Sequence, residues 1–332
     1  ERIDGIIKSE HIEIRDKYKS PRRSEIGESV ESVDIEDLIP NEKVAVLLSK
    51  KGFVKRMPVT NFRRQLRGGR GVSGMTVRDE DLIEQFFVTN THDYLLLFSD
   101  RGRVFKIKVY QVPEASRQGK GVSVSHFLHL DESEKITTLI PVETFNTKNY
   151  LFMATQKGVV KKTAIEAFSY FKNKPIIAIN LDDNDRLRWV KVSTGEQDAV
   201  LVTSAGMVIR FSEEQARPLG RASRGVRGIR IKPEDNLVSM DVIDTEEDDN
   251  RHLLIITRRG YGKNIRLREF KCQNRGGVGV KSLRFRKRID DDCVTDASVV
   301  ARENEMMIIT KAGVLCRQKI GSIATQRREA QG

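Results

Sequence analysis

One pattern of apolar and polar residues recurs six times along the chain. Each copy has a short apolar run, a Ser or Thr, two variable residues, a Gly, and a basic residue three or four positions later. The glycines lie 48 to 56 residues apart and are Gly52, Gly102, Gly158, Gly206, Gly260 and Gly313. A period near 50 residues is typical of a repeat architecture, in which each unit buries its apolar face against the next one.

The second copy shows which elements the pattern predicts. The continuous apolar run at 94–98 predicts a strand that is covered on both faces, and the turn residues up to Gly102 end it. Apolar and polar residues then alternate over 104–109, which predicts a half-buried strand with Lys106 and Lys108 on its outer side. A third strand is expected at 119–124, and a fourth before the run at 82–88. Comparable strands that precede a run are expected at 135–140, 187–192, 237–243 and 294–300.

Four strands in each of six copies predict an all-β protein with six four-stranded blades around an axis. The third copy has Lys174-Pro175-Ile176-Ile177-Ala178 where the others have glycine, and the sixth stops at Gly332, so these blades are the least regular. Kelch and WD-repeat propellers have similar periods, but their tryptophan motifs do not recur, since Trp189 is the single tryptophan. A protein-binding propeller scaffold is nevertheless an alternative function.

The first residues follow a different pattern. Ile3, Ile7, Ile14 and Tyr18 form a helical stripe that stops at Pro21. We therefore expect residues 1–37 to be the helical end of a preceding domain plus an acidic linker. Residues 38–332 are expected to be the repeat domain.

Composition favours a soluble, cytoplasmic protein with a reduced interior. The chain has 332 residues, of which 38% are hydrophobic, and no apolar run is long enough to span a membrane. No signal peptide opens it, and Cys272, Cys293 and Cys316 are single and widely spaced. His126 and His129 lie close together, but no Cys or carboxylate cluster accompanies them. We expect no metal site.

The charge points to a polyanionic partner. Lys and Arg number 59 against 47 acidic residues, a formal net charge of +12. The segments 50–78 and 217–232 contain basic residues and no acidic one. Aromatic residues are only 6%, so the stacking platforms of single-strand binders are absent, and no recognition helix is evident. A polyanion bound as a duplex through its phosphates, without sequence preference, fits this composition best.

The first basic segment contains Gln65, Leu66, Arg67, Gly68, Gly69, Arg70 and Gly71. These residues resemble the seven-residue box of DNA gyrase A subunits, which is usually Gln, a basic residue, Arg-Gly-Gly, a basic residue and Gly. Leu66 departs from it, but Arg63 and Arg64 lie just upstream. FMATQKGVVKKT, TSAGMVIRF and MMIITKAGVLCR also resemble gyrase A segments, in family order. Gly69, Gly71 and Gly74 formally match a dinucleotide fingerprint, but basic residues rather than a strand precede them.

The resemblance implies a six-bladed β-pinwheel, the C-terminal domain of the A subunit, whose blades exchange strands and whose rim wraps duplex DNA. The family's catalytic tyrosine lies in a preceding domain, and its ATP site lies in the B subunit. It implies no catalytic residue and no cofactor in this chain, with Mg²⁺ and ATP used elsewhere in the holoenzyme. The implied partners are double-stranded DNA and, through the preceding domain, the B subunit and a second A subunit. The isolated domain is expected to be monomeric and associated with the chromosome. The corresponding domain of topoisomerase IV is the nearer alternative.

Beyond the box, basic residues at equivalent positions of the copies are candidates for contacts with phosphate on the rim. A flexible glycine-rich loop would let the backbone approach phosphates at the box, although a purely structural turn is the alternative there. The rim candidates are Lys55, Arg56, Arg63, Arg64, Arg103, Lys106, Lys120, Lys161, Lys162, Arg210, Arg221, Arg224, Lys263 and Arg275.

Overall fold

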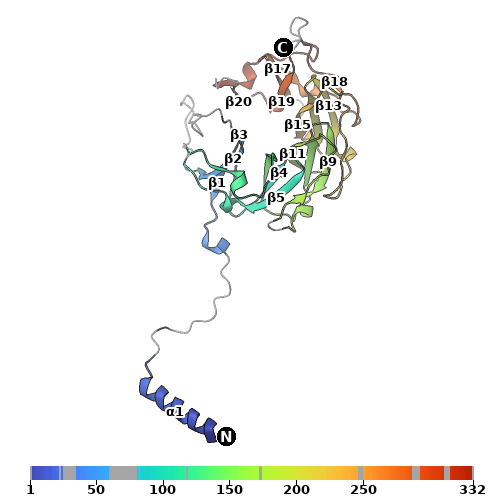
Figure 1. Ribbon diagram of the computed structural model, residues 1–332. Coiled ribbons are helices and arrows are strands. Elements are labelled where there is room, and N and C mark those ends of the chain that lie inside the picture. The colour runs from blue at the N-terminus through green and yellow to red at the C-terminus, as the bar shows by residue number, and fades with distance from the viewer. Residues whose placement is uncertain are drawn as a thin grey trace. The chain divides into compact units, whose positions relative to one another are not determined.

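A computed structural model gives the fold of the chain (Figure 1). It describes residues 2–21, 24, 35–59, 81, 83–116, 119–171, 174–245, 250–285, 292–309 and 315–330. The chain divides into two compact units, Glu1–Pro40 and Asn41–Gly332. The first unit contains α1 (Arg2–Tyr18), which confirms the helix predicted from the isoleucine stripe, and a short 3₁₀ helix, η1 (Ile35–Leu38).

The second unit consists of short strands, most of them about six residues long. They are β1 (Lys43–Ser49), β2 (Phe53–Pro58), β3 (Ile83–Asn90), β4 (Tyr94–Ser99), β5 (Arg103–Lys108), β6 (Val122–Ser123), β7 (Ile136–Val142), β8 (Tyr150–Thr155), β9 (Val159–Ala164), β10 (Ile176–Ile177), β11 (Leu187–Ser193), β12 (Asp198–Thr203), β13 (Met207–Ser212), β14 (Val226–Arg227), β15 (Leu237–Ile243), β16 (Arg251–Thr257), β17 (Gly262–Arg266), β18 (Val280–Lys281), β19 (Val294–Ala301), β20 (Glu305–Ile309) and β21 (Leu315–Lys319). The 3₁₀ helices are η3 (Val109–Gln111), η4 (Val124–His126), η5 (Ile165–Phe168), η6 (Glu213–Gln215), η8 (Leu267–Glu269) and η9 (Ile320–Ser322).

The strands form antiparallel sheets arranged as a ring of blades (Figure 1). Four sheets share one design, with the orders β3-β1-β2-β6, β10-β5-β4-β7, β11-β8-β9-β14 and β15-β12-β13-β18. The fifth sheet is three-stranded, β17-β16-β19, and the sixth copy contributes the two-stranded sheet β20-β21. The prediction of six four-stranded blades is therefore wrong in number, because the described residues form five blades and one hairpin.

The outer strand of each four-stranded blade comes from the next copy of the repeat. β6 follows β5 along the chain but pairs with β2, and β10, β14 and β18 likewise pair with β5, β9 and β13. This confirms the exchange of strands between neighbouring blades. The prediction that the strand before an apolar run shares a blade with that run is wrong: β3, for example, pairs with β1 and completes the preceding blade.

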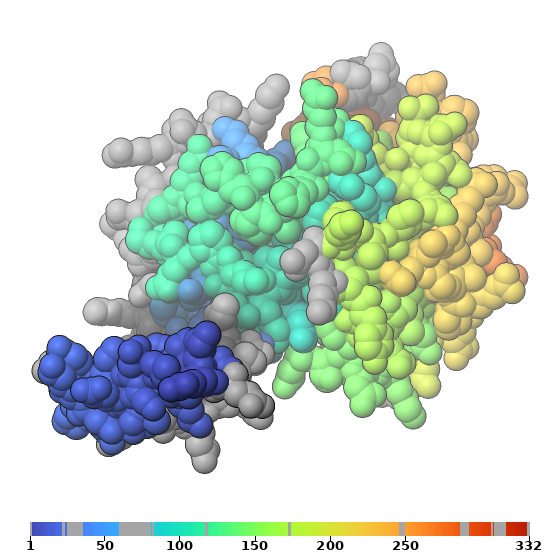
Figure 2. Space-filling model, turned by 60° about the horizontal axis from the view of Figure 1, so that its bottom comes forward, coloured from blue at the N-terminus to red at the C-terminus, as the bar shows by residue number. Residues whose placement is uncertain are grey.

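The apolar run of β4 is continuous because this central strand packs against two neighbouring blades. In β4, Leu95 and Leu97 belong to the core shared with the first blade, and Leu96 and Phe98 belong to the core shared with the third. All four side chains are 0% exposed. Side chains alternate across a strand, so burial on both faces demands an unbroken apolar run. The colours of successive copies also follow one another across the surface in chain order (Figure 2).

The Ser/Thr-x-x-Gly phrase is a turn that links the two central strands of a blade. In the second copy, the Gly102 N–H donates to the Ser99 carbonyl at 3.0 Å, and the Arg103 N–H donates to Ser99 Oγ at 3.3 Å. The hydroxyl therefore caps the turn, while Gly102 adopts a left-handed φ of 77° that glycine tolerates best. Equivalent turns occur at Gly52, Gly158, Gly206 and Gly260.

A second glycine class allows the exchanged strand to approach the preceding blade. A Cβ on Gly121 would lie 2.6 Å from the Val54 carbonyl oxygen, and one on Gly279 would lie 2.5 Å from that of Val208. Both residues also have a left-handed φ. A side chain at either position would push the exchanged strand away from its partner.

Three alanine substitutions should separate these two effects on stability. Gly220→Ala has open space and no left-handed φ, so the free energy of unfolding should be unchanged. Gly52→Ala has open space but a φ of +81°, and should cost about 1–2 kcal/mol. Gly121→Ala adds the clash with Val54 and should cost more than Gly52→Ala. Urea denaturation of the three variants measures their free energies of unfolding. Equal decreases for Gly52→Ala and Gly121→Ala would contradict the proposed close approach.

Candidate nucleic-acid interface

The gyrase-like box and the two arginines before it, residues 63–71, lie outside the described residues. Their contact with DNA stays a prediction. The surface that can be described consists of the outer strands and the loops beside them.

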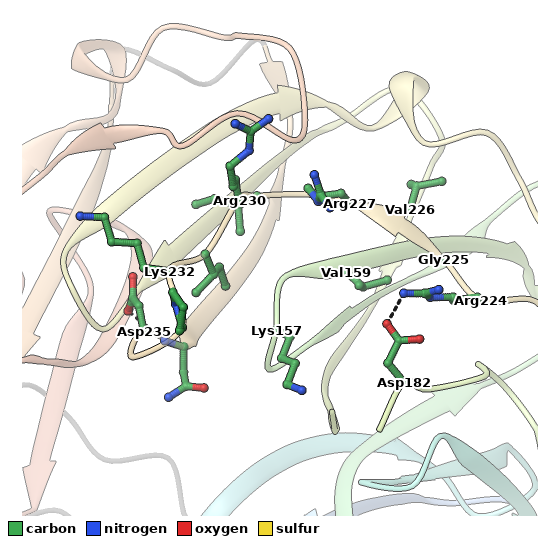
Figure 3. A pocket seen from close by; sticks show the side chains of 14 residues that line it. Lys157, Val159, Asp182, Arg224, Gly225, Val226, Arg227, Arg230, Lys232 and Asp235 are labelled. Atoms are coloured by element: carbon green, nitrogen blue, oxygen red, sulfur yellow. Dashed lines mark hydrogen bonds and ion pairs between the residues drawn. The ribbon is translucent and has the colours of Figure 1, made fainter. Parts of the chain in front are cut away.

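A basic pocket of about 850 Å³ lies beside β14, the outer strand of the third blade (Figure 3). Its basic side chains come from the turn before β9 and from the segment that runs through β14 toward β15. They are Lys157, Arg224, Arg227, Arg230 and Lys232. Val159, Val226, Ile229, Ile231 and Pro233 form much of the apolar lining.

The two carboxylates of the pocket leave most of this positive charge uncompensated. Asp235 is buried and accepts hydrogen bonds from Ser204 Oγ, the Ala205 N–H and the Asn236 N–H. Asp182 pairs with Arg224, but the two side chains are 37% and 68% exposed, so the pair is weak and a stronger anion can displace it. Within the described part of the chain, Arg227, Arg230 and Lys232 form no ion pair. The pocket can therefore accept an anionic group such as a phosphate.

Three predicted rim lysines are buried instead of facing solvent. Lys55, Lys161 and Lys263 are 0–1% exposed, and each ammonium group donates to backbone carbonyls of the next copy, which Lys161 combines with one carbonyl of its own copy. The acceptors are Ser116 and Gly119 for Lys55, Ala178, Arg221 and Ser223 for Lys161, and Arg327, Arg328 and Ala330 for Lys263. Burial lowers the pKa of Lys161 and of Lys263 to about 8, which leaves both charged at neutral pH.

Lys162 and Arg210 are also buried and cannot reach a phosphate in this structure. Lys162 donates to the Glu213 carbonyl at 3.0 Å and is 4% exposed. Arg210 donates to Asp198 Oδ2 at 2.7 Å and is 5% exposed. The prediction that these two residues and the three buried lysines lie on the outer surface is therefore wrong. Each of the five side chains donates to an acceptor inside the protein.

Four further candidates are partly buried and engaged within the chain. Arg56 donates to the Val112 carbonyl, and Arg103 pairs with Glu134 and Asp131. Lys106 donates to the Ser169 carbonyl at 2.6 Å and lies over the rings of Tyr94, Phe145 and Phe171; its pKa is lowered by burial and then by Lys108. Arg275 donates to the Gln215 and Arg227 carbonyls.

Three candidates keep accessible basic groups: Lys120, Arg221 and Arg224. Lys120 and Arg224 are exposed, and Arg221 is half-buried. Lys120 lies on the loop before β6, with its ammonium group 4.4 Å from the centre of the Phe53 ring. Arg221 and Arg224 lie on the loop before β14, which leads into the basic pocket.

The pocket contains basic residues that the candidate set missed. They are Lys157, Arg227, Arg230 and Lys232. The signal that could have found three of them is the segment 217–232, which has no acidic residue and places an arginine at every third position from 221 to 230.

Neither a metal-binding cluster nor a membrane-spanning helix occurs in the part of the chain that the structure describes. No group of three or more His, Cys, Asp or Glu side chains could hold a metal ion there. Nor is any helix among those residues long and apolar enough to cross a membrane.

Sequence comparisons agree with the repeat boundaries. The family model for the DNA gyrase C-terminal domain, a β-propeller, matches residues 44–90, 93–143, 149–194, 197–244 and 251–295. The chain is 39% identical over 330 residues to the DNA gyrase A subunits of Staphylococcus epidermidis and Staphylococcus aureus. Those alignments cover 98% of this chain but only 36% and 37% of the relatives, so the chain spans about a third of their length.

Solved structures share the same architecture. The C-terminal domain of DNA topoisomerase IV matches with a TM-score of 0.75 at 26% identity, covering 89% of this chain and 88% of that one. A DNA gyrase A C-terminal domain matches with a TM-score of 0.68 at 26% identity, covering 88% and 94%. The higher sequence identity to gyrase A subunits favours gyrase over topoisomerase IV. The five matched repeats, the exchanged strands and these relatives place the chain in the DNA gyrase C-terminal domain family.

Proposed function

We propose that this chain binds duplex DNA along its outer edge, without sequence preference, and bends it around the ring of blades. The observation that carries the proposal is the basic pocket beside β14, where three basic side chains have no ion-pair partner among the described residues. Phosphates are the anions that a long basic surface can bind repeatedly. Membership of the gyrase family supports DNA as the source of those phosphates.

Bending requires contacts on several blades. A compact chain of this length has a radius of about 26 Å as a sphere. Bending roughly 40 bp through a half-turn at that radius costs on the order of 10 kcal/mol. Exposed charge contacts contribute about 1 kcal/mol or less each, so around ten must act together. The loop before β6, the loop before β14 and the pocket supply some of them, and the box in residues 65–71 supplies the rest.

In the same proposal the chain is a non-catalytic module of a type II topoisomerase. Its wrapping of DNA would allow the holoenzyme, with a second A subunit and the B subunit, to introduce negative supercoils at the expense of ATP. We propose that the isolated domain is a cytoplasmic monomer that associates with the chromosome. Strand cleavage or ATP hydrolysis by the purified chain would overturn this assignment.

Duplex binding should depend steeply on salt. Ten phosphate contacts predict a slope of log K against log salt of roughly −9. Replacing Arg227, Arg230 and Lys232 together by Ala should make the slope shallower by about 3. Replacing Arg2, Lys8 and Lys17 of α1 removes the same charge from the other unit and should leave the slope unchanged. Fluorescence anisotropy at several salt concentrations measures the slope for the unaltered chain and for the two variants. Equal slopes for the two variants would exclude the pocket from the interface.

The box should control supercoiling more than affinity. In the full-length enzyme, replacing Arg63, Arg64, Arg67 and Arg70 by Ala should abolish negative supercoiling but retain relaxation. The remaining basic residues still hold a straight duplex, whereas they cannot offset a bending cost of about 10 kcal/mol. Plasmid gels give the readout. Normal supercoiling by this variant would show that the box is only a turn.

A further inference from the structure

The buried lysines occur at one position of the repeat, in every second copy. The residue three positions after the turn glycine is Lys55, Lys161 and Lys263 in the first, third and fifth copies. It is Phe105, Ile209 and Cys316 in the second, fourth and sixth. The lysines therefore reach from odd copies into the outer loops of even copies, where they contact carbonyls of Ser116 and Gly119, of Arg221 and Ser223, and of residues 327–330.

The third-to-fourth interface shows what the lysine does to the loop. An ammonium group has three N–H donors, and Lys161 uses them on the carbonyls of Ala178, Arg221 and Ser223. Asn180 Nδ2 donates to the Ala222 carbonyl at 2.7 Å, and Ser223 Oγ donates to that of Gly220 at 2.7 Å. Four consecutive carbonyls of the loop, 220–223, thus accept hydrogen bonds from within the protein.

This arrangement separates the carbonyl oxygens of the loop from its arginine side chains. Carbonyl oxygens carry partial negative charge and would repel a phosphate, and here they are engaged by the fold. The arginines of the same loop do not contact these carbonyls: Arg224 is 68% exposed and pairs, among the described residues, only with the partly exposed Asp182, and the half-buried Arg221 has no hydrogen bond to another described side chain.

The outer loop of the fifth copy is held against the fourth copy without a buried lysine. The fourth copy has Ile209 instead of lysine, and its Cδ1 lies 3.7 Å from where a Cβ on Gly277 would be. In that loop Arg275 itself folds back and donates to the Gln215 and Arg227 carbonyls at 2.9 and 3.0 Å. Where the lysine is missing, the loop arginine is therefore used for hydrogen bonds within the protein.

We propose that Lys161, and by the same geometry Lys55 and Lys263, are positioning residues that leave the described basic side chains of the even copies' outer loops available to bind phosphate. The proposal rests on the proposed function. It assigns Arg221 and Arg224 to the DNA interface through Lys161, and it assigns Arg275 to structure.

The experiment is a mutant cycle on duplex affinity in the full 332-residue chain. Lys161→Met removes the ammonium group, and Arg221→Ala with Arg224→Ala removes the charges it positions. Each change should weaken binding of a 40-bp duplex on the order of 5-fold. The combined variant should bind no more weakly than the two arginine substitutions alone. Lys162→Met is the matched control, because this adjacent buried lysine donates to Gly195 and Glu213 instead of an outer loop, and affinity should be unchanged.

A second readout needs no DNA. In Lys161→Met, hydrogen exchange of the amides in 220–225 should accelerate while that of β9 stays slow. If Lys161→Met does not fold, Lys263→Met is the alternative variant, and the amides to follow are those of the loop that Lys263 contacts, 327–330. Additive losses in the cycle, an equal loss in Lys162→Met, or unchanged exchange in the loop would overturn the positioning role. If the unaltered chain bound no duplex, the proposed function would fail with it, whereas faster loop exchange would still report the structural contact alone.

Discussion

Pairing of the exchanged outer strand with the preceding copy determines how the blades and loops are arranged. Because β6, β10, β14 and β18 each complete the sheet of the preceding copy, no copy can form its own four-stranded blade. The loop that leads into each exchanged strand must therefore lie against the neighbouring blade. Glycines at the close approaches permit this, since a Cβ on Gly225 would lie only 2.3 Å from the Val160 carbonyl oxygen. The same geometry places successive outer loops around the edge of the ring.

Buried cations stabilise these junctions where apolar packing alone would not satisfy the loop. A turning loop exposes carbonyls that must find donors once they are covered. Lys161 and Lys263 each meet three such carbonyls. A buried charge is tolerated only with partners of this kind. The positive charge of the chain is thus divided between the blade junctions, where it satisfies carbonyls, and the outer surface, where we propose that it binds phosphate.

The sequence predicted the architecture more accurately than the site. The apolar runs located the central strands, as at β4 and β8, because burial on two faces leaves an unmistakable pattern. Strand exchange followed from the family resemblance, not from periodicity, since a two-residue strand such as β14 has no pattern of its own. Recurrence misled the choice of rim residues: Lys55 and Lys161 recur because the fold needs them. A lysine on an alternating strand has the same sequence signature whether carbonyls or water surround it.

The proposed bending of duplex DNA around the ring of blades can be measured as a change in the end-to-end distance of the duplex. Energy transfer between dyes at the two ends of a roughly 40-bp duplex reports the bend, because that length is well below the persistence length of about 150 bp. We expect energy transfer to rise when the chain binds, at salt concentrations where binding is complete. Complete binding with energy transfer unchanged from the free duplex would contradict the claim, and would leave a surface that binds DNA without bending it.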